Sequence, residues 1–307
     1  MTLADWTRGT LHDIRQNGVR RGSKDAAHEL WLGALRRLGR LGYRSGYSTY
    51  EREWDVLVIL DACRVDLLRE VADEYSFIGD VETHPSPASM SRTWMNRTFT
   101  PEYSEQIRST AYVTGNPYSA DAIDAGDFET VDEVWRYAWD DEAGTILPRS
   151  ITDRAIRTWR DHRPGRLVVH YMQPHYPFVT ASLGHGIDLD SFDEEETPSV
   201  WKRLQSGDLD HEETWTAYRR NLEYVLDDVA LLLDNIDADR VAISADHGNA
   251  FGEAGIYGHP HDVPLDCLRT VPWVETTATD TGEYEPELER SDADGDVTDR
   301  LEALGYK

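Results

Sequence analysis

The sequence predicts an α/β protein, a three-layer α/β/α sandwich around a mainly parallel central sheet. Three apolar runs predict buried strands, because a parallel strand covered on both faces is apolar throughout: 56–60, 167–172 and 241–245. Helical patterns separate these runs, at 151–162 and over a longer stretch around 215–229 with apolar residues on one face. Strands that alternate with helices in this way are typical of a parallel sheet with helices on both sides.

The composition is that of a globular protein with an acidic surface. The 307 residues are 39% hydrophobic, and 58 Asp and Glu stand against 31 Lys and Arg, a net charge of −27. Such a charge repels a phosphate backbone, so we expect no nucleic-acid partner. The basic residues are almost all arginine, since Lys24, Lys202 and Lys307 are the lysines. This bias indicates the solvated surface of a halophilic protein.

Charge and pattern predict three parts: a basic helical extension over 1–52, the α/β domain over 53–275, and an acidic flexible segment with a C-terminal helix over 276–307. Residues 1–52 hold 10 basic and 5 acidic residues, against the acidic trend of the remainder. No apolar run reaches the ~18–20 residues of a membrane span, and no signal peptide is evident. We therefore expect a cytoplasmic protein, with membrane association left open.

An amphipathic helix is predicted over 23–41, with Ser23 as a candidate N-cap and a basic far end. Its apolar residues near a 3.6-residue period are Ala27, Leu30, Ala34, Leu35 and Leu38. One interpretation is a helix packed on the domain. The other is a helix that rests on an anionic membrane surface or on a partner.

Each predicted strand leads to residues that can bind a metal. The first ends at Asp61, the second leads to His175, and the third to Asp246 and His247. Ligands bind beyond the carboxyl ends of parallel strands, and this set would form a site with nitrogen and oxygen donors. His170, inside the second strand, is interpreted as a buried core residue.

Four segments together resemble the alkaline-phosphatase/sulfatase superfamily: VLVILDACRVDLL, HYMQPHYPF, SADHGNAFGE and YGHP. The resemblance runs from about residue 54 to 273, and its most specific part is DHGNxxGE. More narrowly, the sequence is similar to the sulfatase-like proteins of halophilic archaea. The resemblance implies a metal-dependent hydrolase or transferase that acts on small-molecule or glycan phosphate or sulfate esters.

The resemblance also implies roles for single residues. Asp61, Asp246 and His247 would bind a divalent ion such as Zn, Mn, Mg or Ca, within a site of one or two ions. His259 is similar to a ligand of a second metal or to a substrate-binding group, with His261 as the alternative.

His175 resembles the histidine that contacts the transferred sulfate or phosphate group. Gln173 stands where two-zinc members carry an acidic ligand, so a complete second metal site is in question.

The nucleophile is expected in THPSPASMSRTWMNRTF, a turn that enters a helix, where the helix N-terminus stabilises negative charge. The candidate hydroxyls are Ser86, Ser89, Ser91 and Thr93. Similarity favours Ser91, followed by Thr93, which is alternatively the helix N-cap. Arg92 or Arg97 would hold the anionic oxygens, and Asn116 is expected to face the site.

A formylglycine sulfatase is not expected, because neither Cys63, Cys267 nor Ser91 is followed by the residues of the C/S-x-P/A-x-R pattern. Two other functions stay open. A phosphodiesterase or group transferase for glycan or lipid-linked substrates is favoured by the basic helix. A non-catalytic metal-binding relative is favoured by Gln173.

The acidic charge predicts that stability rises with salt. The Debye length falls from ~30 Å at 0.01 M to ~3 Å at 1 M, so salt screens the self-repulsion of the net charge of −27. The melting temperature, followed by circular dichroism from low to molar KCl, measures this. A melting temperature that does not change over this range would contradict the expectation.

Overall fold

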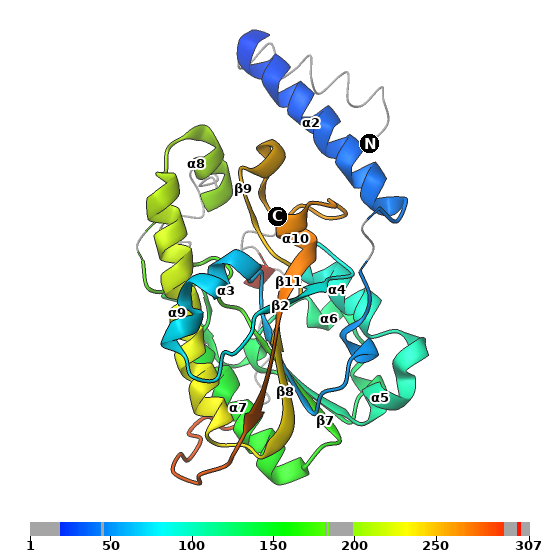
Figure 1. Cartoon of the computed structure of the whole chain (residues 1–307), viewed down its shortest axis with the longest axis vertical. Coiled ribbons are helices and arrows are strands. Elements are labelled where there is room, and N and C mark those ends of the chain that lie inside the picture. The colour runs from blue at the N-terminus through cyan, green and yellow to red at the C-terminus, as the bar shows by residue number, and fades with distance from the viewer. Residues whose placement is uncertain (1–18, 44–45, 182, 184–198, 292–299, 302–307) are drawn as a thin grey trace.

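A computed structural model describes residues 19–43, 46–181, 183, 199–291 and 300–301. A seven-stranded sheet forms its centre, with the strand order β2-β11-β8-β1-β7-β3-β4 (Figure 1). The strands are β1 (Val56–Leu60), β2 (Glu82–Pro85), β3 (Thr110–Thr114), β4 (Thr130–Glu133), β7 (Arg166–Tyr171), β8 (Ala238–Ser244) and β11 (Thr270–Ala278). Two small ribbons pair β5 (Trp139–Asp140) with β6 (Thr145–Ile146), and β9 (Ala250–Phe251) with β10 (Tyr257–Gly258).

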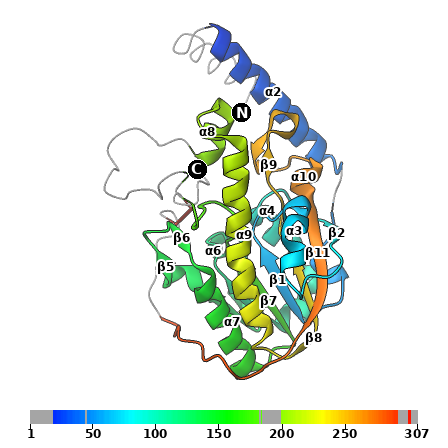
Figure 2. The same ribbon diagram turned by 60° about the vertical axis from the view of Figure 1, so that its left-hand side comes forward.

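Helices cover both faces of the sheet, so the predicted three-layer α/β fold is confirmed. The helices are α2 (Val19–Arg40), α3 (Val65–Val71), α4 (Ser91–Thr98), α5 (Ser104–Arg108), α6 (Ser119–Ala122), α7 (Pro148–His162), α8 (Val200–Ser206), α9 (His211–Leu233) and α10 (Asp266–Arg269). Figure 2 shows α7 and α9 along one face of the sheet. No helix among the described residues is both long and apolar enough to cross a membrane.

The hydrophobic core has two main parts, one on each face of the sheet, because successive side chains along a strand point to opposite faces. In β1, Val56, Val58 and Leu60 pack in the cluster that contains α7 and α9 residues, whereas Leu57 and Ile59 pack with the α4 side of the molecule. All five side chains are buried, which explains why this strand is apolar throughout.

The three predicted strands are neighbours in space, with β1 parallel to β7 on one side and to β8 on the other. Their carboxyl ends therefore lie at one edge of the sheet, where ligands of such sheets bind. β11 runs antiparallel to β8, and β2 antiparallel to β11. The sequence analysis missed these two strands, of which β2 is exposed at three of its four positions.

The end of the α/β domain lies beyond the expected boundary at 275. β11 continues through Ala278 because its pairing with β8 extends to Ala238. The following residues lie against α7, where Asp153 accepts hydrogen bonds from the Tyr284 hydroxyl and from the backbone N–H of Leu288. Apart from residues 300–301, the predicted C-terminal helix lies outside the described residues.

We expect the buried Asp153 to contribute to the attachment of residues 279–291 to α7. Asp153→Ala leaves the Tyr284 hydroxyl and the N–H groups of Glu287 and Leu288 without their acceptor, and we expect a loss of about 1–3 kcal/mol in the free energy of unfolding. Urea unfolding and limited proteolysis at 279–291 measure the effect. The control is Asp161→Ala on the exposed face of α7. Equal stability and equal cleavage of the two variants would contradict the prediction.

Candidate metal centre and active site

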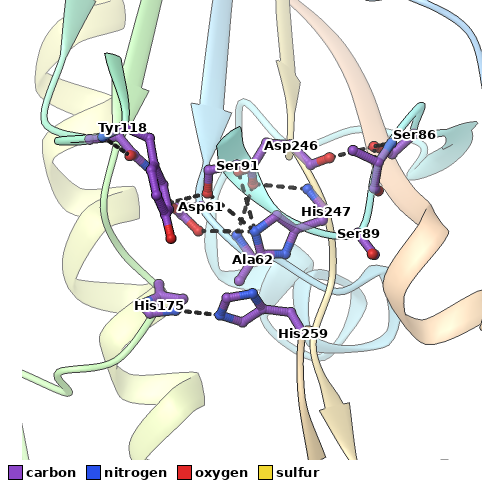
Figure 3. Close-up of polar contacts among 12 residues, drawn as sticks. Asp61, Ala62, Ser86, Ser89, Ser91, Tyr118, His175, Asp246, His247 and His259 are labelled. Atoms are coloured by element: carbon purple, nitrogen blue, oxygen red, sulfur yellow. Dashed lines mark hydrogen bonds and ion pairs between the residues drawn. The ribbon is translucent and has the colours of Figure 1, made fainter. Parts of the chain in front are cut away.

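Asp61 begins the turn that follows β1, at the carboxyl end of the sheet. Its side chain is fully buried, and its Oδ2 accepts hydrogen bonds from Asn116 Nδ2 at 2.8 Å and from Ser91 Oγ at 3.3 Å (Figure 3). The next residue, Ala62, has a φ of 60°, a left-handed conformation that side-chain-bearing residues rarely adopt. This turn directs the Ala62 N–H to Asp246 Oδ1 at 3.1 Å, so the strained backbone joins the two acidic residues.

Asp246 and His247 follow β8, the strand beside β1. The backbone N–H of His247 donates to Asp246 Oδ1 at 2.8 Å, and His247 Nδ1 donates to the Gly248 carbonyl at 2.8 Å. Nδ1 therefore carries the proton of the neutral ring, and Nε2 presents its lone pair. His247 Nε2 lies 3.4 Å from Asp246 Oδ2 and 3.6 Å from Asp61 Oδ1.

These three side chains fit a divalent metal ion. One ligand atom from each of Asp61, Asp246 and His247 lies within 4.8 Å of the others, and all three residues are buried. Asp61 Oδ1 and Asp246 Oδ2 have no hydrogen-bond partner among the described residues. Buried carboxylate oxygens without donors are costly unless a cation neutralises them. The donor set of two carboxylates and one imidazole suits divalent ions.

The electrostatics support the same conclusion. Burial and the nearby Asp246 carboxylate raise the pKa of Asp61 well above its usual range, although Asn116 and Ser91 donate to it. Two buried carboxylates this close disfavour the doubly ionised state. A divalent cation between them removes this repulsion, because it offsets both negative charges.

Ser91 is the candidate hydroxyl that the structure places at this centre. It is the first residue of α4, it is buried, and its Oγ lies 3.3 Å from both Asp61 Oδ2 and His247 Nε2 (Figure 3). Ser86 and Ser89 bond elsewhere, to the carbonyls of Asp246 and Pro260. The first turn of α4 adds the positive potential of a helix N-terminus at the Ser91 position.

Thr93 is not an N-cap, which corrects one of the two interpretations from the sequence. The helix begins two residues earlier, with Met90 in the N-cap position, so Thr93 lies within the first turn. In the described part of the chain its hydroxyl forms no hydrogen bond with Asp61 or Asp246, whereas that of Ser91 donates to Asp61. The geometry favours Ser91 because only an oxygen beside the charged centre can be held in line with a substrate there.

Of the residues predicted to bind the anionic group, Asn116 contacts the candidate metal centre, whereas Arg92 and Arg97 contact other parts of the chain. Arg92 is exposed, with its guanidinium 4.0 Å from Asp121. Arg97 donates to the Pro87 carbonyl at 2.6 Å. Asn116 reaches the centre, but its amide holds Asp61 Oδ2, so we assign it a positioning role for the metal ligand.

His175 and His259 form a pair beside the centre (Figure 3). Their Nε2 atoms are 2.8 Å apart, and the His259 ring centroid is 4.6 Å from that of His247. Burial and the nearby His247 lower the pKa of His175 to about 4, so its ring is neutral near pH 7. Because His175 Nδ1 donates to the Tyr176 carbonyl, its Nε2 accepts the proton that His259 Nε2 carries.

His259 is therefore paired with His175 and lies outside the group of three metal ligands. The alternative, His261, is partly exposed and interacts with Asp262. Gln173 is buried and donates from Nε2 to the Ile146 carbonyl at 2.9 Å. In the described residues, Asp61, Asp246 and His247 form the only group of three acidic or histidine ligands, so a second complete ion site is not seen there.

Two further residues belong to the site, and the sequence analysis did not assign them to it. His170 is buried in β7 as expected, but its Nε2 lies 3.9 Å from Asp61 Oδ2 and 3.8 Å from Asp246 Oδ2. The signal for it was a histidine in the middle of an otherwise apolar strand. Tyr118 lies beside Asp61 (Figure 3), and burial, with a further contribution from that carboxylate, raises its pKa to about 12.

The fold resembles that of a solved phosphoethanolamine transferase. The integral membrane protein lipooligosaccharide phosphoethanolamine transferase A from Neisseria meningitidis aligns with a TM-score of 0.52 and 13% identity over 89% of this chain and 60% of that protein. Its separately solved soluble domain gives a TM-score of 0.49 with 13% identity, over 74% of this chain and 77% of that domain. A protein in the alkaline phosphatase superfamily from Vibrio parahaemolyticus gives 0.40 with 14% identity, over 79% and 64%.

No protein-family model and no curated protein sequence matches the chain. The likeness is therefore one of fold, and this chain spans 60% of the full-length transferase.

The metal centre predicts that Asp246→Ala removes bound metal. The variant loses one of two carboxylates that hold the ion and leaves His247 without the hydrogen-bond acceptor of its N–H. Metal content of the purified protein, measured by inductively coupled plasma mass spectrometry, tests this. Asp239→Ala, at an exposed position of the same strand, is the control. Equal metal content in the two variants would remove Asp246 from the ligand set.

Proposed function

We propose that the protein is a metal-dependent hydrolase or transferase of phosphate or sulfate esters that uses Ser91 as the nucleophile. The observation that carries this proposal is the position of Ser91 Oγ, 3.3 Å from a buried carboxylate oxygen and from His247 Nε2. A structural serine at a helix start does not need to lie beside two buried acidic residues, each of which has one oxygen without a hydrogen-bond partner among the described residues. The motifs of the sequence that resemble the alkaline-phosphatase/sulfatase superfamily favour the same class.

The residues of the chain have distinct roles in this proposal. Asp61, Asp246 and His247 would hold the divalent ion, which supplies Lewis-acid stabilisation of negative charge. Asp61 Oδ2 accepts the hydrogen bond from the Ser91 hydroxyl and orients its oxygen. Asn116 keeps this carboxylate in position, and the N-terminus of α4 favours an anionic group next to Ser91.

The transfer has two steps. Ser91 Oγ forms a bond to phosphorus or sulfur while the bond to the leaving oxygen breaks, and the hydroxyl proton passes to the leaving oxygen, which departs as an alcohol. His259 Nε2–H, which donates to His175 Nε2 in this structure, would donate to an anionic oxygen of the substrate instead. In the second step the oxygen of water or of an alcohol bonds to the transferred group, the bond to Ser91 Oγ breaks, and the proton of the incoming hydroxyl returns to Ser91. Water as the acceptor gives hydrolysis, and an alcohol gives group transfer.

A group transferase on a lipid-linked or glycan substrate is the second candidate function. The observation that favours it is the basic helix α2, which stands apart from the sheet at one end of the molecule (Figure 1). The two functions differ in the acceptor of the second step. Product analysis with and without an added alcohol distinguishes them, because a transferase forms the new ester and a hydrolase releases the free anion.

Ser91→Ala is expected to reduce turnover of an aryl phosphate, phosphodiester or sulfate ester by more than ~10³-fold, because no neighbouring hydroxyl replaces the attacking oxygen. Metal should stay bound, since Asp61, Asp246 and His247 are unchanged in this variant. Assays use Mn²⁺, Zn²⁺, Mg²⁺ or Ca²⁺ added to the purified protein. Thr93→Ala is the matched control in the same helix turn, and we expect it to keep its activity.

Loss of activity in Thr93→Ala with full activity in Ser91→Ala would move the nucleophile by two residues. Full activity in both variants would reject a covalent mechanism. A wild-type protein that binds metal but turns over none of these esters would favour the non-catalytic relative.

A further inference from the structure

The exposed large hydrophobic side chains gather in one short part of the chain. Among the described residues they are Leu30, Trp31, Leu38, Leu41, Tyr43 and Tyr47. All belong to α2 or to the residues that follow it. Contiguous exposed apolar surface of this kind marks an interaction site rather than a neutral piece of surface.

Most apolar residues of α2 are exposed, although the helix also packs on the domain through Leu35, as one of the two interpretations from the sequence states. Ala27, Leu30, Trp31, Ala34 and Leu38 are all exposed, with 54%, 47% and 45% of Leu30, Trp31 and Leu38 accessible to solvent. At 3.6 residues per turn these five positions fall within about 100° of the helix circumference. They form one stripe, which we call the outer stripe.

Contacts on the side of α2 next to the outer stripe hold this orientation. Leu35 is 6% exposed and packs with Ala250, Ile256, Val263 and Leu268. Gly39 lies so close to Asp262 that a Cβ at this position would be 1.9 Å from the Asp262 carbonyl oxygen.

Two polar contacts add to this attachment. His28 Nε2 lies 3.0 Å from the Gly255 carbonyl oxygen. Trp31, at the edge of the outer stripe, keeps an exposed ring but donates from Nε1 to the Ala254 carbonyl at 3.0 Å. The helix therefore cannot rotate to bury the outer stripe without breaking these contacts.

The charge next to the outer stripe identifies the partner. α2 carries six basic and two acidic residues, whereas the whole chain has a net charge of −27. Arg37 is exposed beside the outer stripe, and Arg40, also exposed, forms an ion pair with Asp262. An apolar stripe flanked by basic residues is the pattern of a helix that lies in the interface of an anionic membrane, with Trp at the headgroup level.

We propose that the outer stripe of α2 binds the surface of an anionic lipid bilayer. A second copy of the chain fits this face less well. Pairing two such stripes would bring the arginines of both helices together and two strongly acidic bodies close to one another. A bilayer with anionic lipids offers apolar depth and negative charge at the same place. The proposal does not depend on the catalytic role of Ser91.

Vesicle sedimentation tests the proposal with the full chain. Vesicles of phosphatidylcholine with about one third phosphatidylglycerol are compared with pure phosphatidylcholine vesicles. KCl is set to the lowest concentration at which the melting curve shows folded protein. We expect binding to the anionic vesicles only. The double variant Leu30→Ser/Leu38→Ser should bind at least about tenfold more weakly, and Arg37→Glu at least about fivefold more weakly.

Arg108→Glu on α5 is the matched charge control and should bind like the wild type, because Arg108 is exposed and far along the chain from α2. Melting curves establish that the α2 variants, whose changed side chains are exposed, are folded. Absence of binding by the folded wild type would overturn the proposal, as would equal binding to both kinds of vesicle or binding unchanged in Leu30→Ser/Leu38→Ser. A dimer that dissociates in this double variant, without any vesicle binding, would assign the outer stripe to a second copy instead.

Discussion

The burial of two carboxylates side by side is the constraint on which the site depends. Asp61 and Asp246 are both fully buried, and each has an oxygen without a hydrogen-bond partner among the described residues. Their other oxygens accept from Ala62, Asn116, Ser91 and His247, so the chain supplies donors to one side of each group. The remaining negative charge is costly, and either a proton, as the raised pKa of Asp61 indicates, or the proposed divalent cation would neutralise it. Binding of such a cation would be coupled to the folding of this region.

The sheet supplies the rigid frame for this arrangement. Asp61 follows β1, Asp246 follows β8, and His170 lies in β7, so three adjacent parallel strands deliver the groups to one edge. The loop after β8 is packed tightly, since a Cβ at Gly248 would lie 2.1 Å from the Cys267 carbonyl oxygen. Such packing holds His247 in one place relative to Ser91, and catalysis by a positioned hydroxyl depends on that precision.

The same loops connect the site to α2. The residues on which Leu35 packs lie between 250 and 268, the segment that also contains His259. A surface that attracts α2 would therefore lie at the end of the molecule where the carboxyl ends of the strands meet. The distribution of charge supports this placement of the surface, because α2 is rich in basic residues whereas the chain as a whole has a net charge of −27.

The local sequence pattern was sufficient to predict the central strands, the helices α7 and α9, and the acidic and histidine residues at the strand ends. These features depend on residues close together in the sequence, whose periodicity or position after a buried run is visible without the fold. The resemblance of the motifs supplied the chemistry. The edge strand β2 and its neighbour β11 were missed because the pairing that defines them joins residues far apart in the chain.

Only the tertiary structure distinguished Ser91 from Thr93, placed His170 against the carboxylates, and showed that the apolar stripe of α2 faces solvent. Each of these depends on contacts between distant residues: Ser91 with His247, His170 with Asp246, and His28 with Gly255. An amphipathic pattern states that a helix has an apolar face, but which surface that face meets is set by the rest of the fold.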